Sequence, residues 1–297
     1  MEVRLADHFG MCFGVRDAID LALGLAREQP VTVLGELVHN EEVVQELETA
    51  GARHAHEVDE IATQTVVLTA HGTSKRRQLR LHSEGFVTHD AACPLVTRVH
   101  TAVAKLTAEG RHPVVIGQQG HVEVQGIIED LEECTVVLHE DDLAALAGKP
   151  RIGVVAQTTQ PLELVLSLVN AMRRRYPRAD IRFIDTVCQP TKDRQEALRR
   201  LAAECSVVVV VGGPTSNNSR KLAELARKLG CRTYQVARAD DLKPEWFRDV
   251  DRVGLTAGTS TPDRVIDEVR SRLESMPGRD HSRSSAKQSA TSVLSGH

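Results

Sequence analysis

The chain has 297 residues, 41% of them hydrophobic and 26% charged, and a formal net charge of −4 at pH 7. This length suits one large domain or two to three small ones. The weak negative charge offers no basic surface for nucleic acid, and no stretch approaches the ~20 apolar residues that span a bilayer. We therefore expect no nucleic-acid partner and no membrane partner. Residues 1–7 lack the segments of a secretory signal, which favours a cytoplasmic location.

Apolar, strand-like runs alternate with amphipathic helical patterns along the whole chain. In chain order, strands are predicted at residues 2–6, 31–34, 65–70, 86–90, 113–117, 135–138, 152–156, 181–185, 206–212, 232–236 and 252–256. Helices are predicted between them, where apolar residues return every three or four positions, within 15–29, 40–51, 95–110, 161–177, 194–204 and 218–230. Such alternation predicts an α/β fold with parallel sheets covered by helices.

The pattern contains a weak threefold repeat, with similar cysteine-bearing turns roughly 80 to 95 residues apart. We predict three small α/β lobes that pack on one another: residues 1–95, 96–188 and 189–277. The first lobe would include the N-terminal strand, with Cys12 reaching the centre. Residues 278–297 contain few apolar side chains to bury, and we expect a disordered tail there.

Six cysteines in a cytoplasmic protein are expected to be reduced thiols, which favours metal binding or catalysis over disulfides. Three begin apolar strands and are expected in the core: Cys134, Cys205 and Cys231. The other three follow strands, stand near Gly or Pro, and precede amphipathic helices: Cys12, Cys93 and Cys188. A helix N-terminus lowers the pKa of a thiol and favours the thiolate that binds metal.

Three thiolates could hold an iron–sulfur cluster or a zinc ion. Their wide spacing differs from the short motifs of ferredoxins and zinc ribbons, so structural thiols remain an alternative at this point. Polar side chains also gather on loops that follow the strands: His39, His71, His121, Glu123, and residues 157–159, 215–219 and 259–261. Each loop alone could be an ordinary helix cap. Their recurrence at one topological position favours an anion site, such as one for phosphate.

Several motifs, in order, resemble the LytB/IspH family of 4-hydroxy-3-methylbut-2-enyl diphosphate reductases. They are GMCFGV, ELVHN, AHGTS, DAACPLVTRVH, GHVEVQG, AQTT, the segment from Cys188 to RQEA, SNNSRKLAELA and GLTAGTSTPD. The resemblance covers essentially residues 1–275. It implies three α/β lobes in a pseudo-threefold arrangement around a central iron–sulfur site. One [4Fe–4S] cluster would be bound by Cys12, Cys93 and Cys188, leaving the fourth iron without a thiolate.

The resemblance also implies the reaction and the roles of the polar side chains. The substrate hydroxyl would leave as water after two-electron reduction, giving isopentenyl and dimethylallyl diphosphate in the last step of the methylerythritol phosphate pathway. Glu123 would deliver protons, assisted by His121 and Thr158. The substrate would be bound by His39, His71, His121, Thr158, Ser216, Asn217, Asn218 and Ser260. The chain lacks a dinucleotide-binding glycine fingerprint, so we expect ferredoxin or flavodoxin as electron donor.

Some positions depart from the family pattern and suggest a divergent paralogue with a reshaped phosphate grip. They are Phe13, the Gln118–Gln119 stretch, Val122, Asn217 and the CQPTKDRQ segment that begins at Cys188. Two other functions stay open. One is a zinc-dependent hydrolase in which the three cysteines bind the metal and Glu123 is the base. The other is a non-catalytic phosphometabolite-binding protein whose cysteines are core packing.

Overall fold

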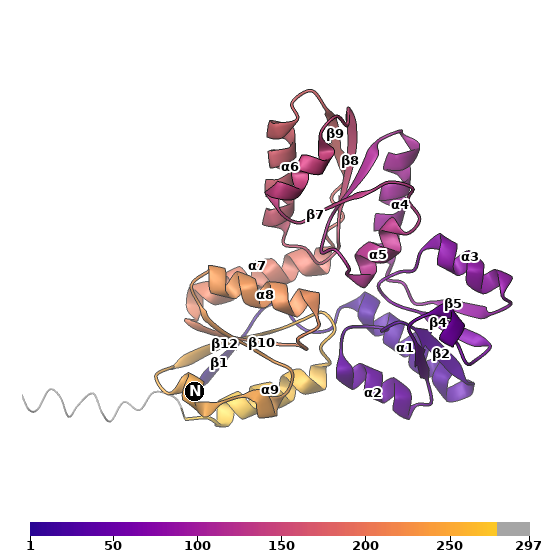
Figure 1. The fold of residues 1–297 in the computed structure, drawn as a ribbon. Coiled ribbons are helices and arrows are strands. Elements are labelled where there is room, and N and C mark those ends of the chain that lie inside the picture. The colour runs from indigo at the N-terminus through magenta and orange to yellow at the C-terminus, as the bar shows by residue number, and fades with distance from the viewer. Residues whose placement is uncertain (278–297) are drawn as a thin grey trace, which may run out of the picture.

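Three parallel sheets of four strands each, covered by helices, surround a common centre (Figure 1). This architecture comes from a computed structural model, which describes residues 1–277. The predicted α/β class and the three lobes are confirmed. No helix within residues 1–277 is long and apolar enough to cross a membrane. The predicted tail at 278–297 lies outside the described residues.

The first lobe contains the sheet β3–β2–β4–β5. Its strands are β2 (Val31–Leu34), β3 (Arg53–Ala55), β4 (Thr65–Leu68) and β5 (Val87–Asp90). Its helices are α1 (Phe13–Glu28), α2 (Glu41–Thr49) and α3 (Lys75–Ser83). The sequence pattern does not predict β3. This three-residue strand carries two polar side chains and is formed by pairing with β2 rather than by its own composition.

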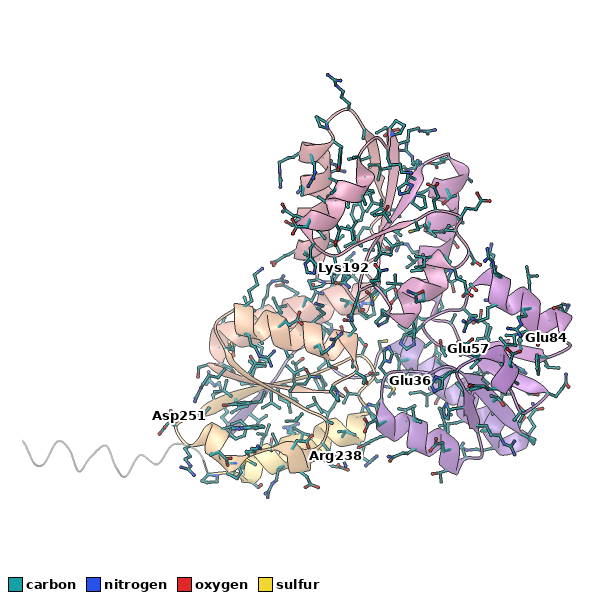
Figure 2. The ribbon with its side chains drawn as sticks, in the orientation of Figure 1. Glu36, Glu57, Glu84, Lys192, Arg238 and Asp251 are labelled. Atoms are coloured by element: carbon teal, nitrogen blue, oxygen red, sulfur yellow. The ribbon has the colours of Figure 1, made fainter. Side chains whose placement is uncertain are left out.

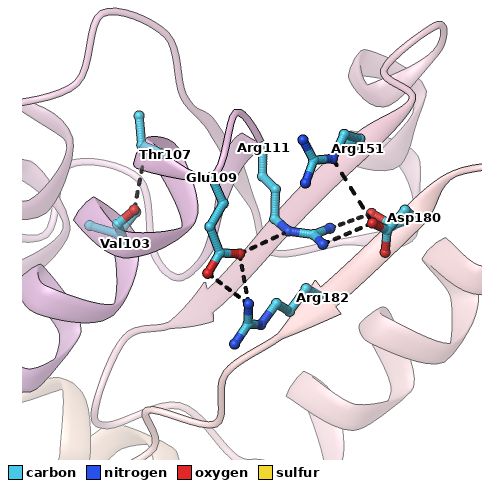
Figure 3. A network of polar contacts seen from close by, with 7 residues as sticks. All are labelled: Val103, Thr107, Glu109, Arg111, Arg151, Asp180 and Arg182. Carbon is cyan, nitrogen blue, oxygen red and sulfur yellow. Dashed lines mark hydrogen bonds and ion pairs between the residues drawn. The ribbon is translucent and has the colours of Figure 1, made fainter.

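The second lobe contains the sheet β7–β6–β8–β9. Its strands are β6 (His112–Ile116), β7 (Thr135–Val137), β8 (Arg151–Ala156) and β9 (Asp180–Phe183). Its helices are α4 (Pro94–Ala108), α5 (Val122–Ile128) and α6 (Leu162–Arg175). An ion-pair network fastens the edge strand β9 to the end of α4 (Figure 3): Arg111 pairs with Asp180 at 2.8 Å, and Arg182 pairs with Glu109 at 2.7 Å. These contacts fix the start of the segment that leads to Cys188.

The third lobe contains the sheet β11–β10–β12–β1. Its later strands are β10 (Val207–Val211), β11 (Arg232–Val236) and β12 (Arg252–Ala257), and its helices are α7 (Gln189–Glu204), α8 (Asn217–Lys228) and α9 (Asp263–Ser275). The fourth strand is β1 (Glu2–Leu5), which pairs in parallel with β12. The lobe boundary expected at residues 1–95 is therefore wrong for the first strand. Alternating burial identifies an edge strand but does not identify its partner.

The three sheets share one strand order, in which the first and third strands of a lobe are neighbours. The inner strands are almost entirely buried; all five valines of β10 have no exposed surface. At ~25 cal/mol per Å² of buried apolar area, these strands dominate the stability of each lobe. Cys205 and Cys231 lie buried in the core of the third lobe, and Cys134 packs against that of the second, as predicted.

Candidate active site

Each of the three candidate cysteines occupies the same structural position in its lobe. It follows the fourth strand of a sheet and is the N-cap residue of a long helix: Cys12 before α1, Cys93 before α4 and Cys188 before α7. Proline in the first turn of α4 and α7 fixes where these helices begin. None of the three thiols forms a capping hydrogen bond, although Cys188 Sγ lies 3.0 Å from the Thr191 hydroxyl.

The same backbone hydrogen bond holds all three cysteine turns. The amide of each cysteine donates to a carbonyl on the loop after the third strand of the same sheet. The acceptors for Cys12, Cys93 and Cys188 are Thr259, Ala70 and Thr158, at 3.1, 3.1 and 3.0 Å. The weak repeat in the sequence therefore corresponds to a threefold repeat of backbone geometry.

The three sulfurs line a single central cavity between the lobes. All three cysteines are half-buried. Gly14 lies directly against Cys93, and a methyl group on Gly14 would overlap with Cys93 Sγ. Burial raises the pKa of Cys93 and raises that of Cys188 to about 11. Thiolates at these positions therefore need a positive partner such as metal.

The donor set of the cavity can be compared with the needs of a cofactor. Within residues 1–277, no three His, Cys, Asp or Glu side chains form a group that could hold a single metal ion. Three cysteines do lie on the wall of one cavity. Cysteine thiolates are the ligands that hold iron–sulfur clusters, so this donor set fits such a cluster.

Three histidines from two lobes form a second wall of the same cavity. The ring centroids of His39 and His71 are 4.4 Å apart, and that of His121 lies 5.3 and 5.9 Å from them. Burial, and then repulsion from the other rings, holds the pKa of His71 well below its usual value. Burial also lowers the pKa of His121 to about 4. Protonated rings repel one another, and an anion bound in this cavity would offset that repulsion.

Hydrogen bonds fix the orientation of two of these rings. Glu36 (labelled in Figure 2) can only accept, so His39 carries a proton on Nδ1, 2.7 Å from the carboxylate. His121 Nδ1 accepts from the amide of Glu123 at 3.1 Å, which leaves the proton of neutral His121 on Nε2. The buried atoms His39 Nε2 and His71 Nδ1 have no hydrogen-bond partner among the described residues.

Glu123 is the second residue of α5, two positions after His121, and is 1% exposed. Its carboxylate accepts the Thr158 amide at 2.6 Å and the Thr158 hydroxyl at 2.9 Å. Burial raises the pKa of Glu123 to about 7, although both hydrogen bonds oppose this rise. A buried carboxyl group that titrates near neutrality can hold and release a proton at physiological pH.

The third lobe adds hydroxyl and amide groups to the cavity wall: Ser216, Asn217, Asn218 and Ser260. Ser216 caps α8, and the buried Asn218 Nδ2 has no partner among the described residues. Ser260 Oγ donates to the His39 carbonyl at 3.1 Å, which joins the third lobe to the first. The lining residues of this cavity therefore offer several donors but include no lysine or arginine among residues 1–277.

One guanidinium joins two of the positions that depart from the family pattern. Arg220 Nη2 donates to Gln118 Oε1 at 2.9 Å and to Asn217 Oδ1 at 3.2 Å. Asn217 Nδ2 then donates to Thr159 Oγ1 at 3.0 Å. This set of four residues, which we call the Arg220 clasp, connects the second and third lobes beside the cavity. Sequence reasoning missed Arg220, because an arginine in the first turn of a helix has no local signal for such a role.

All the candidate site residues are brought to this one cavity. They are Cys12, Cys93, Cys188, His39, His71, His121, Glu123, Thr158, Ser216, Asn217, Asn218 and Ser260. They come from the ends of the first, third and fourth strands of each sheet, where open α/β sheets bind ligands. Phe13 also lines the cavity and is 49% exposed.

Solved structures and curated relatives resemble this chain over nearly its whole length. A reductase of E-1-hydroxy-2-methyl-but-2-enyl 4-diphosphate from Plasmodium falciparum superposes with a TM-score of 0.88 at 26% identity, covering 93% of this chain and 89% of that one. A second structure is described as (E)-4-hydroxy-3-methyl-but-2-enyl diphosphate reductase, the terminal enzyme of the non-mevalonate pathway. It has a TM-score of 0.67 at 35% identity and covers 92% and 99%.

Two curated relatives are named 4-hydroxy-3-methylbut-2-enyl diphosphate reductase. The protein of Methylibium petroleiphilum is 41% identical over 93% of this chain and 85% of its own length. That of Aquifex aeolicus is 36% identical over 92% and 96%. A family model described as LytB protein matches residues 3–274. The resemblance inferred from the motifs is thereby confirmed: the chain belongs to the LytB family.

Proposed function

We propose that this chain reduces 4-hydroxy-3-methylbut-2-enyl diphosphate to isopentenyl and dimethylallyl diphosphate, in the last step of the methylerythritol phosphate pathway. The balanced reaction takes up two electrons and two protons and releases the hydroxyl group as water. The observation that carries the proposal is the meeting of three equivalent cysteines with a buried, near-neutral carboxyl group on one cavity. The two curated relatives, 41% and 36% identical to this chain, are named as reductases of the same diphosphate.

Cys12, Cys93 and Cys188 would hold one [4Fe–4S] cluster. When bound, such a cluster supplies electrons one at a time and acts as a Lewis acid toward the substrate hydroxyl. The electrons would come from a ferredoxin or flavodoxin. We place the enzyme in the cytoplasm, where the cysteines stay reduced.

The histidines and the third-lobe side chains would bind the diphosphate. Unpartnered polar atoms of His39, His71 and Asn218 are buried in residues that line the cavity, and they cost free energy until a ligand satisfies them. A diphosphate offers many acceptor oxygens to the Asn218 amide, and to His39 and His71 once each ring carries a second proton. Its negative charge would raise the depressed pKa of His71 and His121, so diphosphate binding near pH 6 is expected to take up protons.

Glu123 would supply protons to the departing hydroxyl and to the allylic carbon. Thr158 holds both carboxylate oxygens and so fixes the direction in which Glu123 faces the cavity. Thr158 also accepts the amide hydrogen bond of Cys188, which couples the proton donor to the third cysteine turn. Because Glu123 and the three cysteines line the same cavity, protons and electrons would be delivered to one place.

Anaerobic reconstitution tests this function. The wild-type protein is expected to bind about four irons per chain, to absorb near 410 nm, and to convert the diphosphate with reduced viologen as donor. The Cys93→Ser variant should lose colour and turnover completely. Cys134→Ser, which changes a thiol of the second-lobe core, is the matched control and should keep both.

Other results would favour the alternative functions. One equivalent of zinc, with activity that survives air, would support the zinc-dependent hydrolase. A colourless protein in which Cys93→Ser leaves diphosphate affinity unchanged would support the non-catalytic binding protein.

A further inference from the structure

Arg194 is a buried cation on α7, six positions after Cys188 in the sequence. Arg194 is only 6% exposed. A guanidinium stays charged in proteins, so burial does not neutralise it and some negative group has to compensate it. Arginine in such an environment normally forms an ion pair with a carboxylate.

The hydrogen bonds of Arg194 do not provide that compensation. Nη1 donates to the Pro190 carbonyl at 2.9 Å within α7, and Nη2 donates to the carbonyl of Gly10. Both acceptors are neutral, and the buried Nε has no partner in the part of the chain that the structure describes. Within residues 1–277, Arg194 forms no ion pair with a carboxylate. The neighbouring Asp193 is itself engaged by the Gln189 amide at 2.7 Å.

Arg194 lies between two of the cysteine turns. Burial lowers the pKa of Arg194, and the thiolates of Cys12 and Cys188, followed by Asp193, oppose that effect. Cys188 precedes α7, and Gly10 stands two residues before Cys12. Arg194 therefore links the loop that precedes Cys12 to the first turn of the helix that follows Cys188.

We propose that Arg194 is a positioning residue of the cysteine site, which ties the Cys12 loop to the Cys188 helix and supplies a fixed positive charge to the thiolate-bound cofactor. This inference rests on the proposed function. A positive charge near an iron–sulfur cluster stabilises the reduced state, which carries one more negative charge, and so raises the midpoint potential. Removing it should make the cluster harder to reduce.

The test compares Arg194→Lys, which keeps the charge, with Arg194→Gln, which keeps hydrogen-bond donors without charge. Arg199→Gln is the matched control, because Arg199 lies on the same helix, is 30% exposed and pairs with Glu163. Each full-length protein is reconstituted anaerobically. Iron content and the midpoint potential, followed by electron paramagnetic resonance, are measured alongside thermal unfolding.

The expected result is a more negative midpoint potential, or loss of bound iron from a folded protein, in Arg194→Gln. Arg194→Lys should stay close to the wild type, and Arg199→Gln should be unchanged. A fully loaded Arg194→Gln protein with the wild-type potential would overturn the inference, as would an Arg194→Lys protein that behaves like Arg194→Gln. A wild-type protein that binds no iron would instead refute the proposed function.

Discussion

The cysteine turns and the polar wall of the cavity are built by the same three lobes, yet only the cysteine turns are alike. Each turn has a cysteine at the N-cap of a helix and the same amide hydrogen bond behind it. The polar wall differs in every lobe: two imidazoles come from the first, an imidazole with Glu123 and Thr158 from the second, and hydroxyl and amide groups from the third.

This difference shows how a repeated fold can serve a substrate that has no threefold symmetry. Helix α5 begins with His121 at its N-cap and has Glu123 at its second position. The equivalent second residues of α2 and α8 are Glu42 and Asn218. Glu42 is half-exposed and pairs with Arg264 at 2.9 Å, whereas Glu123 is buried. Burial, rather than residue type, gives one of two equivalent carboxyl groups its chemistry.

Replacing Glu123 tests that distinction most severely. Glu123→Gln should keep both contacts to Thr158 and lower kcat roughly 10²- to 10⁴-fold, with KM little changed, because the proton donor is lost. The matched Glu42→Gln variant should retain wild-type turnover. If both variants lost activity equally, the two carboxyl groups would not be functionally distinct.

The raised pKa of Glu123 also predicts how the turnover and stability of the wild type depend on pH, compared with Glu123→Gln. Since only the protonated acid donates, wild-type kcat should fall as pH rises through about 7. The folded pKa exceeds the ordinary 4.5, so the stability from this group is present below pH 4.5 and lost as pH rises through 7. The lost stability is at most about 3 kcal/mol. Denaturant unfolding at pH 8 should find Glu123→Gln more stable than the wild type.

Gly14 tests the contact between neighbouring cysteine turns. Gly14→Ala would place a methyl group against Cys93 Sγ, costing about 1–3 kcal/mol by overpacking and displacing that sulfur. We expect iron content and turnover to fall by at least about tenfold, the equivalent of 1.4 kcal/mol. Gly24, on the same helix, has no neighbouring atom within 4 Å. Gly24→Ala should therefore keep its iron and gain roughly 0.5–1 kcal/mol of stability; normal iron loading of Gly14→Ala would disprove the close contact.

A substitution in the Arg220 clasp tests the polar wall of the cavity, and it has the smallest expected effect of these variants. In Arg220→Gln, Asn217 keeps its bond to Thr159 but loses one of the two partners that orient its amide. KM should therefore rise roughly tenfold, which is about 1.4 kcal/mol, while kcat stays within about twofold. Lys221→Gln, which removes the adjacent surface pair with Glu224, should change neither constant. An unchanged KM in Arg220→Gln would mean that the clasp has no influence on the substrate.

The cysteine turns could be predicted from the sequence because their signals are local. An apolar strand, a cysteine, a proline and a helical period all lie within about 15 residues around Cys93, and the same pattern occurs near Cys188. The loops that carry His39, His71 and His121 follow predicted strands and are found in the cavity as expected. Assigning roles to these residues, however, required the resemblance to a family.

The features that sequence reasoning missed depend on contacts between distant segments. Arg194 bonds to Gly10, 184 positions away, and Arg220 bonds to Gln118, 102 positions away. Neither arginine differs in its local pattern from the exposed arginines on the same helices. Strand β3 was missed for a related reason, since its pairing with β2 outweighs its weak local preference. Such features become visible only when the fold has brought the partners together.

The pairing of β1 with β12 also determines when the Cys12 turn can form during protein synthesis. Residues 2–5 leave the ribosome long before their partners, residues 252–255, which lie 250 positions later in the chain. Until then Cys12 lacks the Thr259 carbonyl that anchors its turn, while the turns of Cys93 and Cys188 find their acceptors within shorter segments. A nascent chain that stops before the third lobe therefore presents two anchored thiols and one unanchored thiol. Insertion of the proposed cluster should therefore follow translation through Thr259.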